Sequence, residues 1–162
     1  MKIKAILLGD SGVGKSTLLS LIRPNHNIIP TIGIDCVLHD KIQFWDTSGD
    51  KRFTSVVETL YERMDLVIFV YNNLESLSSI ELYRRKFCKN DKYFIIVYNG
   101  NNKNEADQGR MYSIMYNMKF LKGNLKLTRE AERVLNQIVK STILCVKDLS
   151  IVQNGWRYCW FY

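Results

Sequence analysis

The sequence predicts an α/β fold: a mainly parallel six-stranded sheet with one antiparallel edge hairpin and helices on both faces. Six short apolar runs recur along the 162 residues, and helical patterns separate most of them. The apolar residues of these runs are continuous rather than alternating, which is typical of parallel strands buried on both faces. A chain of this length is expected to form a single domain, residues 1–162.

The predicted strands coincide with these apolar runs. The second and third strands flank only the turn at His39 and Asp40, so we expect them to form the antiparallel hairpin. Ligands of such sheets bind at the carboxyl ends of the strands, so the loops that follow the strands are the expected site. The six predicted strands are Ile3–Leu8, Ile34–Leu38, Ile42–Trp45, Leu66–Tyr71, Tyr93–Tyr98 and Ile143–Val146.

The helical spacing of apolar residues predicts helices between these strands. A helix that includes Thr17 is stopped by Pro24, and Thr128 is the expected N-cap of the last helix. Ser78 and Glu81 have the spacing of a capping box. The predicted apolar faces are Val56, Val57, Leu60, Tyr61 and Met64; Ile80, Tyr83 and Phe87; and Ala131, Val134, Leu135, Ile138 and Val139.

The segment from residue 103 to 124 begins rich in asparagine and lysine and continues with Met111, Met115 and Met118 at helical spacing. Methionine commonly fills gaps in protein cores, and this favours a short packed helix. The alternative interpretation is a surface on which a partner protein binds.

The composition argues against several classes of protein. The sequence has no run of about 18 apolar residues and no leader before the first strand, so neither a membrane span nor a signal peptide is expected. Four separated cysteines without a C-x-x-C pair favour reduced thiols in the cytoplasm. The net charge of +7 favours acidic partners in general, but the densest cluster, Arg84-Arg85-Lys86, is expected to be a solvated helix face. Nucleic-acid binding would rest on net charge alone, so no nucleic acid is expected as a partner.

A glycine-rich segment after the first predicted strand matches G-x-x-x-x-G-K-[ST] from Gly9 to Ser16. It stands between a strand and a helix, the context in which this pattern forms a phosphate-binding loop. Glycines let several backbone N–H groups point at anionic oxygens, and the N-terminus of the helix adds a positive field. We expect Lys15 to contact the outer phosphates and the Ser16 hydroxyl to bind Mg²⁺.

Two further segments fit a nucleoside triphosphate site. Asp46 lies at the end of a predicted strand and begins the pattern D-x-x-G, so we expect its carboxylate to hold a Mg²⁺-bound water and the Gly49 N–H to contact a γ-phosphate. Asp and Gly are common in turns, so D-x-x-G alone is weak evidence for a nucleotide site. It becomes strong evidence because it follows a phosphate-binding loop in the same chain. Thr31 is expected to bring a second hydroxyl to Mg²⁺ from a loop that hydrolysis releases.

From residue 2 to about residue 99 the chain resembles the Ras superfamily of small GTPases and, within it, the Rab family. Gly9 to Ser16 is similar to the Rab phosphate loop. Thr31-Ile32-Gly33-Ile34-Asp35 resembles the end of Rab switch I, T-I-G-V-D, and the segment from Trp45 to Phe53 resembles switch II, W-D-T-A-G-Q-E-R-F. The resemblance thins further on, which indicates a compact member that diverges in its C-terminal third.

The resemblance implies a P-loop NTPase G-domain of three layers, with GTP or GDP and Mg²⁺ as ligands. It implies a GTPase that acts as a molecular switch in vesicle trafficking, in the cytoplasm or peripherally on endomembranes. Effectors and regulators would bind near Thr31 and from Asp46 to Phe53. The implied catalytic residues are Lys15, Thr31, Gly49 and Asp50, and the implied metal ligands are Ser16, Thr31 and Asp46. The implied nucleotide-binding residues are Asp10, Ser11, Gly12, Val13, Gly14, Lys15, Ser16, Thr17, Asn99, Asn102, Cys145, Val146 and Lys147.

Asp50 departs from the family pattern, because it stands where the family has the glutamine that orients the attacking water. A carboxylate is repelled by a γ-phosphate and lacks an amide donor. We therefore expect slow intrinsic hydrolysis of GTP.

The guanine-reading motif of the family, N-K-x-D, is also altered. Asn99-Gly100-Asn101-Asn102 directly follows a predicted strand, whereas Asn102-Lys103-Asn104-Glu105 keeps Asn, Lys and a carboxylate three residues later. The first register is favoured because the family motif abuts its strand. An amide offers one acceptor where the family's Asp accepts two hydrogen bonds, so both registers predict weaker or altered base selectivity. Cys145-Val146-Lys147 stands in place of the family's S-A-K, and only the Lys matches.

Two more departures concern partners and membranes. The switch I loop and hairpin are shorter than in typical Rabs, so partners that read those surfaces are expected to fit poorly. The end of the chain, Cys159-Trp160-Phe161-Tyr162, has the cysteine spacing of a prenylation signal without its usual residues, which leaves membrane attachment open.

Two alternatives to an active switch remain: a degenerate nucleotide-binding module or decoy for host trafficking proteins, and a nucleotide kinase, for which no arginine-bearing lid is recognisable.

Overall fold

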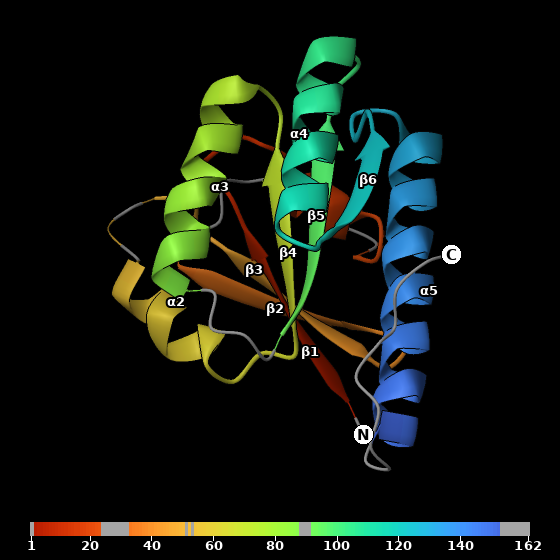
Figure 1. Ribbon diagram of the computed structural model, residues 1–162. Helices are drawn as coiled ribbons and strands as arrows, with labels where there is room; N and C mark the ends of the chain where they lie inside the picture. The colour runs from red at the N-terminus through yellow and green to blue at the C-terminus, as the bar shows by residue number, and fades with distance from the viewer. Residues whose placement is uncertain (1, 24–32, 51, 53, 88–91, 153–162) are drawn as a thin grey trace.

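The computed structural model describes residues 2–23, 33–50, 52, 54–87 and 92–152, and Figure 1 shows how they are arranged. Its strands form one six-stranded sheet in the order β2-β3-β1-β4-β5-β6, with helices on both faces. The α/β fold predicted from the sequence is therefore confirmed. The elements are β1 Ile3–Leu8, α1 Lys15–Ser20, β2 Ile34–His39, β3 Ile42–Thr47, α2 Thr54–Tyr61, β4 Leu66–Tyr71, α3 Leu74–Phe87, β5 Tyr93–Asn99, α4 Lys103–Met115, β6 Lys119–Gly123 and α5 Thr128–Val152.

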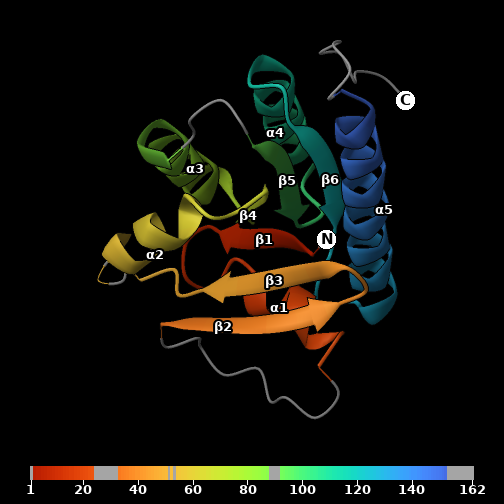
Figure 2. The ribbon, with the colours of Figure 1, turned by 90° about the horizontal axis from the view of Figure 1, so that it is seen from below.

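The strand pairing matches the predicted mixture of parallel and antiparallel strands. β1 lies inside the sheet and pairs in parallel with β3 and β4. β4 pairs in parallel with β5, and β5 with β6. β2 and β3 form the antiparallel hairpin at one edge, with Ile34 opposite Thr47 and His39 opposite Ile42 (Figure 2).

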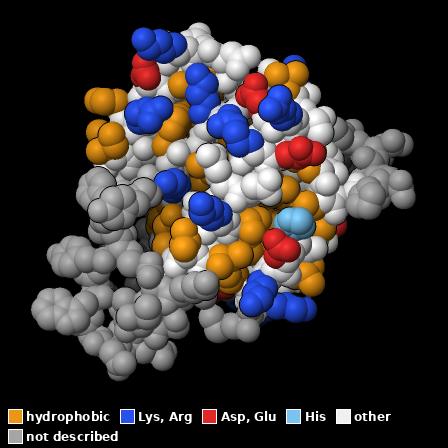
Figure 3. Space-filling view, turned by 90° about the vertical axis from the view of Figure 1, so that its right-hand side faces the viewer, with side chains coloured by type: hydrophobic (Ala, Val, Ile, Leu, Met, Phe, Trp, Pro, Cys, Tyr) orange, Lys and Arg blue, Asp and Glu red, His pale blue; other side chains and the backbone are white. Residues whose placement is uncertain are grey.

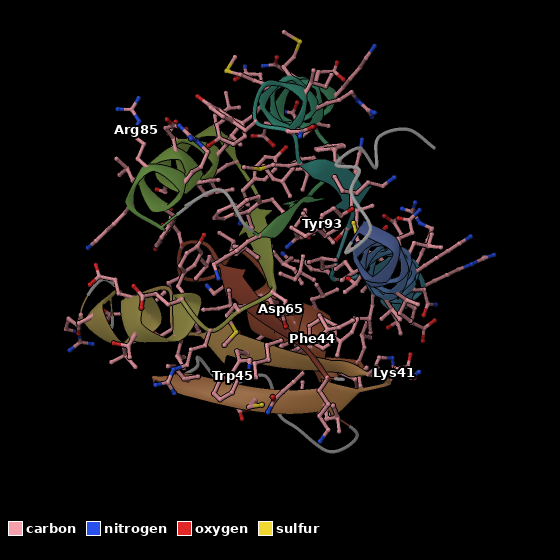
Figure 4. All side chains as sticks on the ribbon, turned by 60° about the horizontal axis from the view of Figure 1, so that its bottom comes forward. Lys41, Phe44, Trp45, Asp65, Arg85 and Tyr93 are labelled. Atoms are coloured by element: carbon pink, nitrogen blue, oxygen red, sulfur yellow. The ribbon has the colours of Figure 1, made fainter. Side chains whose placement is uncertain are left out.

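Different helices cover the two faces of the sheet. Successive residues of a strand point to opposite faces of the sheet. Phe44 therefore packs into the hydrophobic core on the face covered by α1 and α5 (Figure 4). Trp45 packs against the hydrophobic core on the other face, which α2, α3 and α4 cover. The predicted apolar stripe of α5 is confirmed, because Ala131, Val134 and Ile138 are fully buried. This two-sided burial accounts for the continuous apolar runs of the central strands.

The prediction of a sixth strand at Ile143–Val146 is wrong. These residues lie within α5, and the sixth strand is instead Lys119–Gly123. The helix continues because its buried stripe extends to Thr142, whose hydroxyl donates to the carbonyl oxygen of Ile138 at 2.7 Å. A short apolar run therefore continues a long helix rather than forming a strand.

The segment from residue 103 to 124 also differs from the prediction. It forms α4 and then β6, and Met111 and Met115 are 68% and 70% exposed, so they do not pack into the core. The buried face of α4 is formed by small residues instead, including Gly109. A Cβ atom at Gly109 would lie 1.7 Å from the hydroxyl of Tyr71, so only glycine allows α4 to approach β4 this closely.

Helix α3 begins at Leu74, one turn before the capping box predicted from Ser78 and Glu81. The side-chain oxygen of Asn73 accepts a hydrogen bond from the Ser76 N–H at 2.8 Å and so satisfies the first turn. Ser78 lies inside the helix, where its hydroxyl donates to the carbonyl oxygen of Leu74 at 3.0 Å.

The basic cluster at the end of α3 is paired with acidic side chains of the same protein. Arg84 and Arg85 both contact Glu81, and Lys86 contacts Glu58. The hydrogen bonds from Arg84, Tyr112 and Arg85 lower the pKa of Glu81 to about 2. Arg85 and Lys86 are exposed, as predicted for a solvated helix face, whereas Arg84 is only 23% exposed and lies over the ring of Tyr116.

The face of α5 carries many basic side chains, which lie among uncharged and acidic ones in Figure 3. Arg129, Arg133 and Lys140 line a shallow hollow on this helix together with Glu132. The positive charge of this face is therefore interspersed with negative charge.

Among the described helices, none combines the length and the apolar composition that a bilayer crossing requires.

Candidate functional site

The glycine-rich segment forms the loop between β1 and α1, at the edge of the sheet where the strands end. Gly14 is the N-cap of α1, with a φ of 108°. A Cβ atom at this position would lie 2.6 Å from the side-chain nitrogen of Asn99. Both the backbone conformation and the close approach of β5 therefore require glycine here.

Lys15 is buried beneath this loop. Its Nζ donates to the carbonyl oxygens of Gly9 at 2.8 Å and Asp10 at 2.7 Å. Burial lowers the pKa of Lys15 to about 8, and the nearby carboxylates of Asp46 and Asp10 oppose this shift. The loop therefore holds a cation in place within a site suited to an anion.

Asp46 lies at the end of β3 and is 1% exposed. Thr47, the next residue, fixes the strand end, because its hydroxyl donates to the carbonyl oxygen of Leu7 at 2.6 Å. Asp46 and the Ser16 hydroxyl at the start of α1 are oxygen donors of the kind that Mg²⁺ prefers, so these residues fit the ion. The third predicted ligand, Thr31, lies outside the described residues. No cluster of three or more His, Cys, Asp or Glu that could hold a metal occurs in the described part of the chain.

Gly49 packs directly against the phosphate-binding loop. A Cβ atom at this position would lie 2.2 Å from the backbone nitrogen of Ser11. The D-x-x-G segment and the glycine-rich loop are therefore in backbone contact, as the sequence-based prediction of a shared site requires.

Asp50 is paired with Arg52, a contact that no sequence pattern indicated. The carboxylate accepts from Nε of Arg52 at 2.8 Å, from Nη2 at 2.6 Å and from the Arg52 backbone N–H at 2.9 Å. These hydrogen bonds lower the pKa of Asp50, so its side chain is an anion at neutral pH. The guanidinium of Arg52 faces solvent, with 82% of its side chain exposed.

Tyr83 of α3 reaches the same region, although the sequence indicated only a core position. It lines a small cavity with Gly9, Ser48 and Asp50. Burial raises the pKa of Tyr83, and the carboxylate of Asp10 raises it further. The apolar spacing of α3 gave no signal for this placement.

Asn99, the last residue of β5, joins two loops at the site. Its Nδ2 donates to the carbonyl oxygen of Val13 at 2.8 Å, and its Oδ1 accepts from the Leu125 N–H at 2.9 Å. One amide side chain therefore connects the phosphate-binding loop with the loop that follows β6. This position supports the first register of the altered N-K-x-D motif.

Asn102, the base-facing residue of the first register, and Glu105, that of the second, both belong to the start of α4. Asn102 is the N-cap, and its side-chain oxygen accepts from the N–H groups of Asn104 at 2.9 Å and Glu105 at 3.4 Å. The Glu105 carboxylate accepts from the Tyr98 hydroxyl at 2.5 Å. The pattern Asn102-Lys103-Asn104-Glu105 is therefore a helix start in which Tyr98 links the two ends of a capping box.

A family model, Roc, described as "Ras of Complex, Roc, domain of DAPkinase", matches residues 4–105, more than half of the chain. This range contains the phosphate-binding loop, the D-x-x-G segment and Asn99. The chain belongs to the Ras superfamily of small GTPases.

Within the superfamily, this small GTPase is similar to Rab proteins. It is 29% identical to Ras-related protein RabC of Dictyostelium discoideum over 93% of its length and 89% of the relative. It is 31% identical to the Ypt/Rab-type GTPase ypt7 of Schizosaccharomyces pombe over 68% of its length and 63% of that protein. It is 37% identical to Ras-related protein RABG1 of Arabidopsis thaliana over 54% and 50%. The Rab resemblance inferred from the motifs is therefore confirmed.

The structure does not bring one predicted set of nucleotide-binding residues to the site of this small GTPase. Cys145, Val146 and Lys147 lie in α5, and Cys145 interacts with the side chain of Tyr93, at the opposite end of β5 from Asn99 (Figure 4). The loop that reaches the site is Asn124-Leu125-Lys126, directly after β6. It also ends in lysine, and this was the signal in the sequence that could have revealed it.

Proposed function

We propose that this chain is a Rab-like switch that binds GTP with Mg²⁺ tightly through the phosphate-binding loop and hydrolyses it slowly. The pairing of Asp50 with Arg52 is the observation that carries this proposal. A water-orienting side chain must offer a donor and an acceptor to the attacking water. Asp50 has no donor, and both of its oxygens already accept hydrogen bonds from Arg52.

The remaining residues supply positioning and charge. Lys15 would contact the β- and γ-phosphates, and backbone N–H groups from Asp10 to Thr17 would surround them. Ser16, Asp46 and Thr31 would hold Mg²⁺, which neutralises phosphate charge when bound. The Gly49 N–H would contact the γ-phosphate. Asn99 would position the base-binding loops, and Leu125 rather than Cys145 would lie against the base.

The same features support a second candidate, a degenerate GTPase that acts as a nucleotide-dependent binding module or a decoy for host trafficking proteins. Asp50 and Asn102 favour it, because both depart from the family pattern. Effectors and regulators would bind near Thr31 and from Asp46 to Phe53 in either case. The Rab relatives support a cytoplasmic protein that works peripherally on endomembranes.

The lowered pKa of Lys15 predicts pH-dependent phosphate binding. In the free protein Lys15 loses its proton above about pH 8, whereas bound phosphates favour the ammonium form. Binding then takes up a proton, so affinity for inorganic tripolyphosphate with Mg²⁺ should fall about tenfold from pH 7 to pH 9 and stay constant below pH 7.5. Titration calorimetry measures this, and a flat profile up to pH 9 would contradict it.

The nucleotide that copurifies with the protein tests the proposed function. We expect chromatography of the denatured protein to release a guanine nucleotide in close to one-to-one ratio. Single-turnover assays with and without extracts containing activating proteins then separate the candidates. Acceleration by an extract supports a switch, and no hydrolysis under either condition supports the binding module. Protein that holds no nucleotide and binds none would refute both.

A further inference from the structure

Tyr83 of helix α3 lies at the boundary between the phosphate-binding loop and the D-x-x-G segment. Its ring packs against the hydrophobic core on the face that α2, α3 and α4 cover. The side chain lines a cavity together with Gly9 of the loop and with Ser48 and Asp50 of the segment. Burial raises the pKa of its hydroxyl, and the nearby carboxylate of Asp10 raises it further. One side chain from a third element therefore meets both segments.

The cavity that these residues line has a volume of about 10 Å³, which is about the room that a single water molecule needs. Polar groups around so small a space are satisfied by one another or through one bridging water. A tyrosine hydroxyl can donate and accept at the same time, so it can join groups of the loop to groups of the segment. Because burial raises its pKa, the Tyr83 hydroxyl keeps its proton at neutral pH and remains a donor.

The contact between the loop and the segment leaves no room for a shift of either one toward the other. A Cβ atom at Gly49 would lie 2.2 Å from the backbone nitrogen of Ser11 and 2.4 Å from the carbonyl carbon of Asp10. Ile80, one turn before Tyr83 in α3, is fully buried, so the helix supports Tyr83 from a fixed position. Tyr83 is therefore placed to keep the segment against the loop.

We propose that Tyr83 is a positioning residue that holds the D-x-x-G segment against the phosphate-binding loop and thereby favours a nucleoside triphosphate over the diphosphate. This rests on the proposed function, in which the Gly49 N–H contacts the γ-phosphate. A segment that is held in place before the nucleotide arrives needs no further ordering, so the γ-phosphate contact contributes its full affinity. A diphosphate makes no such contact, and its affinity does not depend on the segment.

The substitution Tyr83→Phe removes the hydroxyl and keeps the ring in the hydrophobic core. In this variant the γ-phosphate must itself order the D-x-x-G segment. A hydroxyl in such a place is worth about one hydrogen bond, so we expect the affinity for guanosine 5′-(β,γ-imido)triphosphate to fall about fivefold. The affinity for GDP should stay at the wild-type value. The imido analogue resists hydrolysis, so the measurement reports binding alone.

Tyr112→Phe is the matched control, because it removes a tyrosine hydroxyl from the other side of α3. The Tyr112 hydroxyl donates to the Glu81 carboxylate at 2.7 Å, between α4 and α3, and Tyr112 does not line the cavity. A general loosening of α3 would appear in both variants. We expect Tyr112→Phe to bind both nucleotides as wild-type protein does.

The experiment is titration calorimetry of GDP and of guanosine 5′-(β,γ-imido)triphosphate with the full chain and Mg²⁺, for wild-type protein and both variants. A selective loss of triphosphate affinity in Tyr83→Phe supports the inference. An equal loss for both nucleotides would show a merely structural role and overturn it, as would no loss for either; the proposed function would stand in both cases. Wild-type protein that binds neither nucleotide would overturn the proposed function and the inference together.

Discussion

Replacing Lys15 with methionine is expected to weaken the binding of GTP with Mg²⁺ by about a hundredfold, the usual worth of charge-assisted hydrogen bonds inside a site. Methionine preserves the apolar stem of the side chain but removes the buried ammonium group, which donates to the Gly9 and Asp10 carbonyls. The loss should be the same for tripolyphosphate, because Lys15 contacts phosphates and not the base. Titration calorimetry with both ligands measures it.

Lys41→Met is the matched control for this substitution. Lys41 is exposed in the hairpin turn between β2 and β3 (Figure 4), so its replacement removes the same charge from the molecule without altering the phosphate-binding loop. Equal losses in both variants would mean that net charge, rather than the position of Lys15, attracts the nucleotide. Circular dichroism would establish that both variants are folded.

Replacing Asp50 with glutamine is expected to raise the single-turnover rate of GTP hydrolysis by at least about tenfold, within the range of a positioned general acid or base. Glutamine supplies a donor and an acceptor and cannot form the ion pair in which Arg52 Nε and Nη2 both donate to one oxygen of Asp50. The rate is measured as conversion of protein-bound GTP to GDP after Mg²⁺ is added.

Asp50→Leu separates the two effects of this substitution. Leucine removes the negative charge and releases Arg52, but it orients no water. We expect the leucine variant to hydrolyse GTP no faster than wild type. If the leucine variant matched the glutamine variant, repulsion by the carboxylate alone would explain the slow rate. If neither variant accelerated hydrolysis, Asp50 would not limit the reaction.

The elements that the sequence predicted well are those whose signal is local. Five strand predictions correspond to β1, β2, β3, β4 and β5, because each contains a distinct apolar run. The phosphate-binding loop and the D-x-x-G segment meet because both follow strands whose carboxyl ends lie at one edge of the sheet.

The errors arose where tertiary packing overrides the local signal. β6 carries two lysines and a glycine in five residues, so its sequence does not resemble a buried strand. Because β6 has no clear strand signal, the S-A-K pattern matches a later segment, Cys145-Val146-Lys147, which lies in α5. The role of Asn102 was also hidden, because a polar residue after a strand reads equally well as a ligand for a base or as the cap of a helix.

The pairing of Asp50 with Arg52 shows a different limit. The two residues are close in sequence, but the ion pair depends on a loop conformation that no periodicity encodes. Sequence alone identified the missing glutamine, and the structure added that the replacement is occupied by a partner. The ion pair gives the expected slow hydrolysis a specific physical cause.

The central claim is that this GTPase binds GTP tightly and hydrolyses it slowly. The most direct test follows dissociation and hydrolysis of bound GTP together, in wild-type protein and in the Asp50→Gln variant. We predict that GTP loaded with Mg²⁺ stays bound and is recovered largely intact when the Asp50→Gln variant has already converted most of its GTP to GDP. Rapid conversion by wild-type protein, at or above the rate of Asp50→Gln, would contradict this prediction.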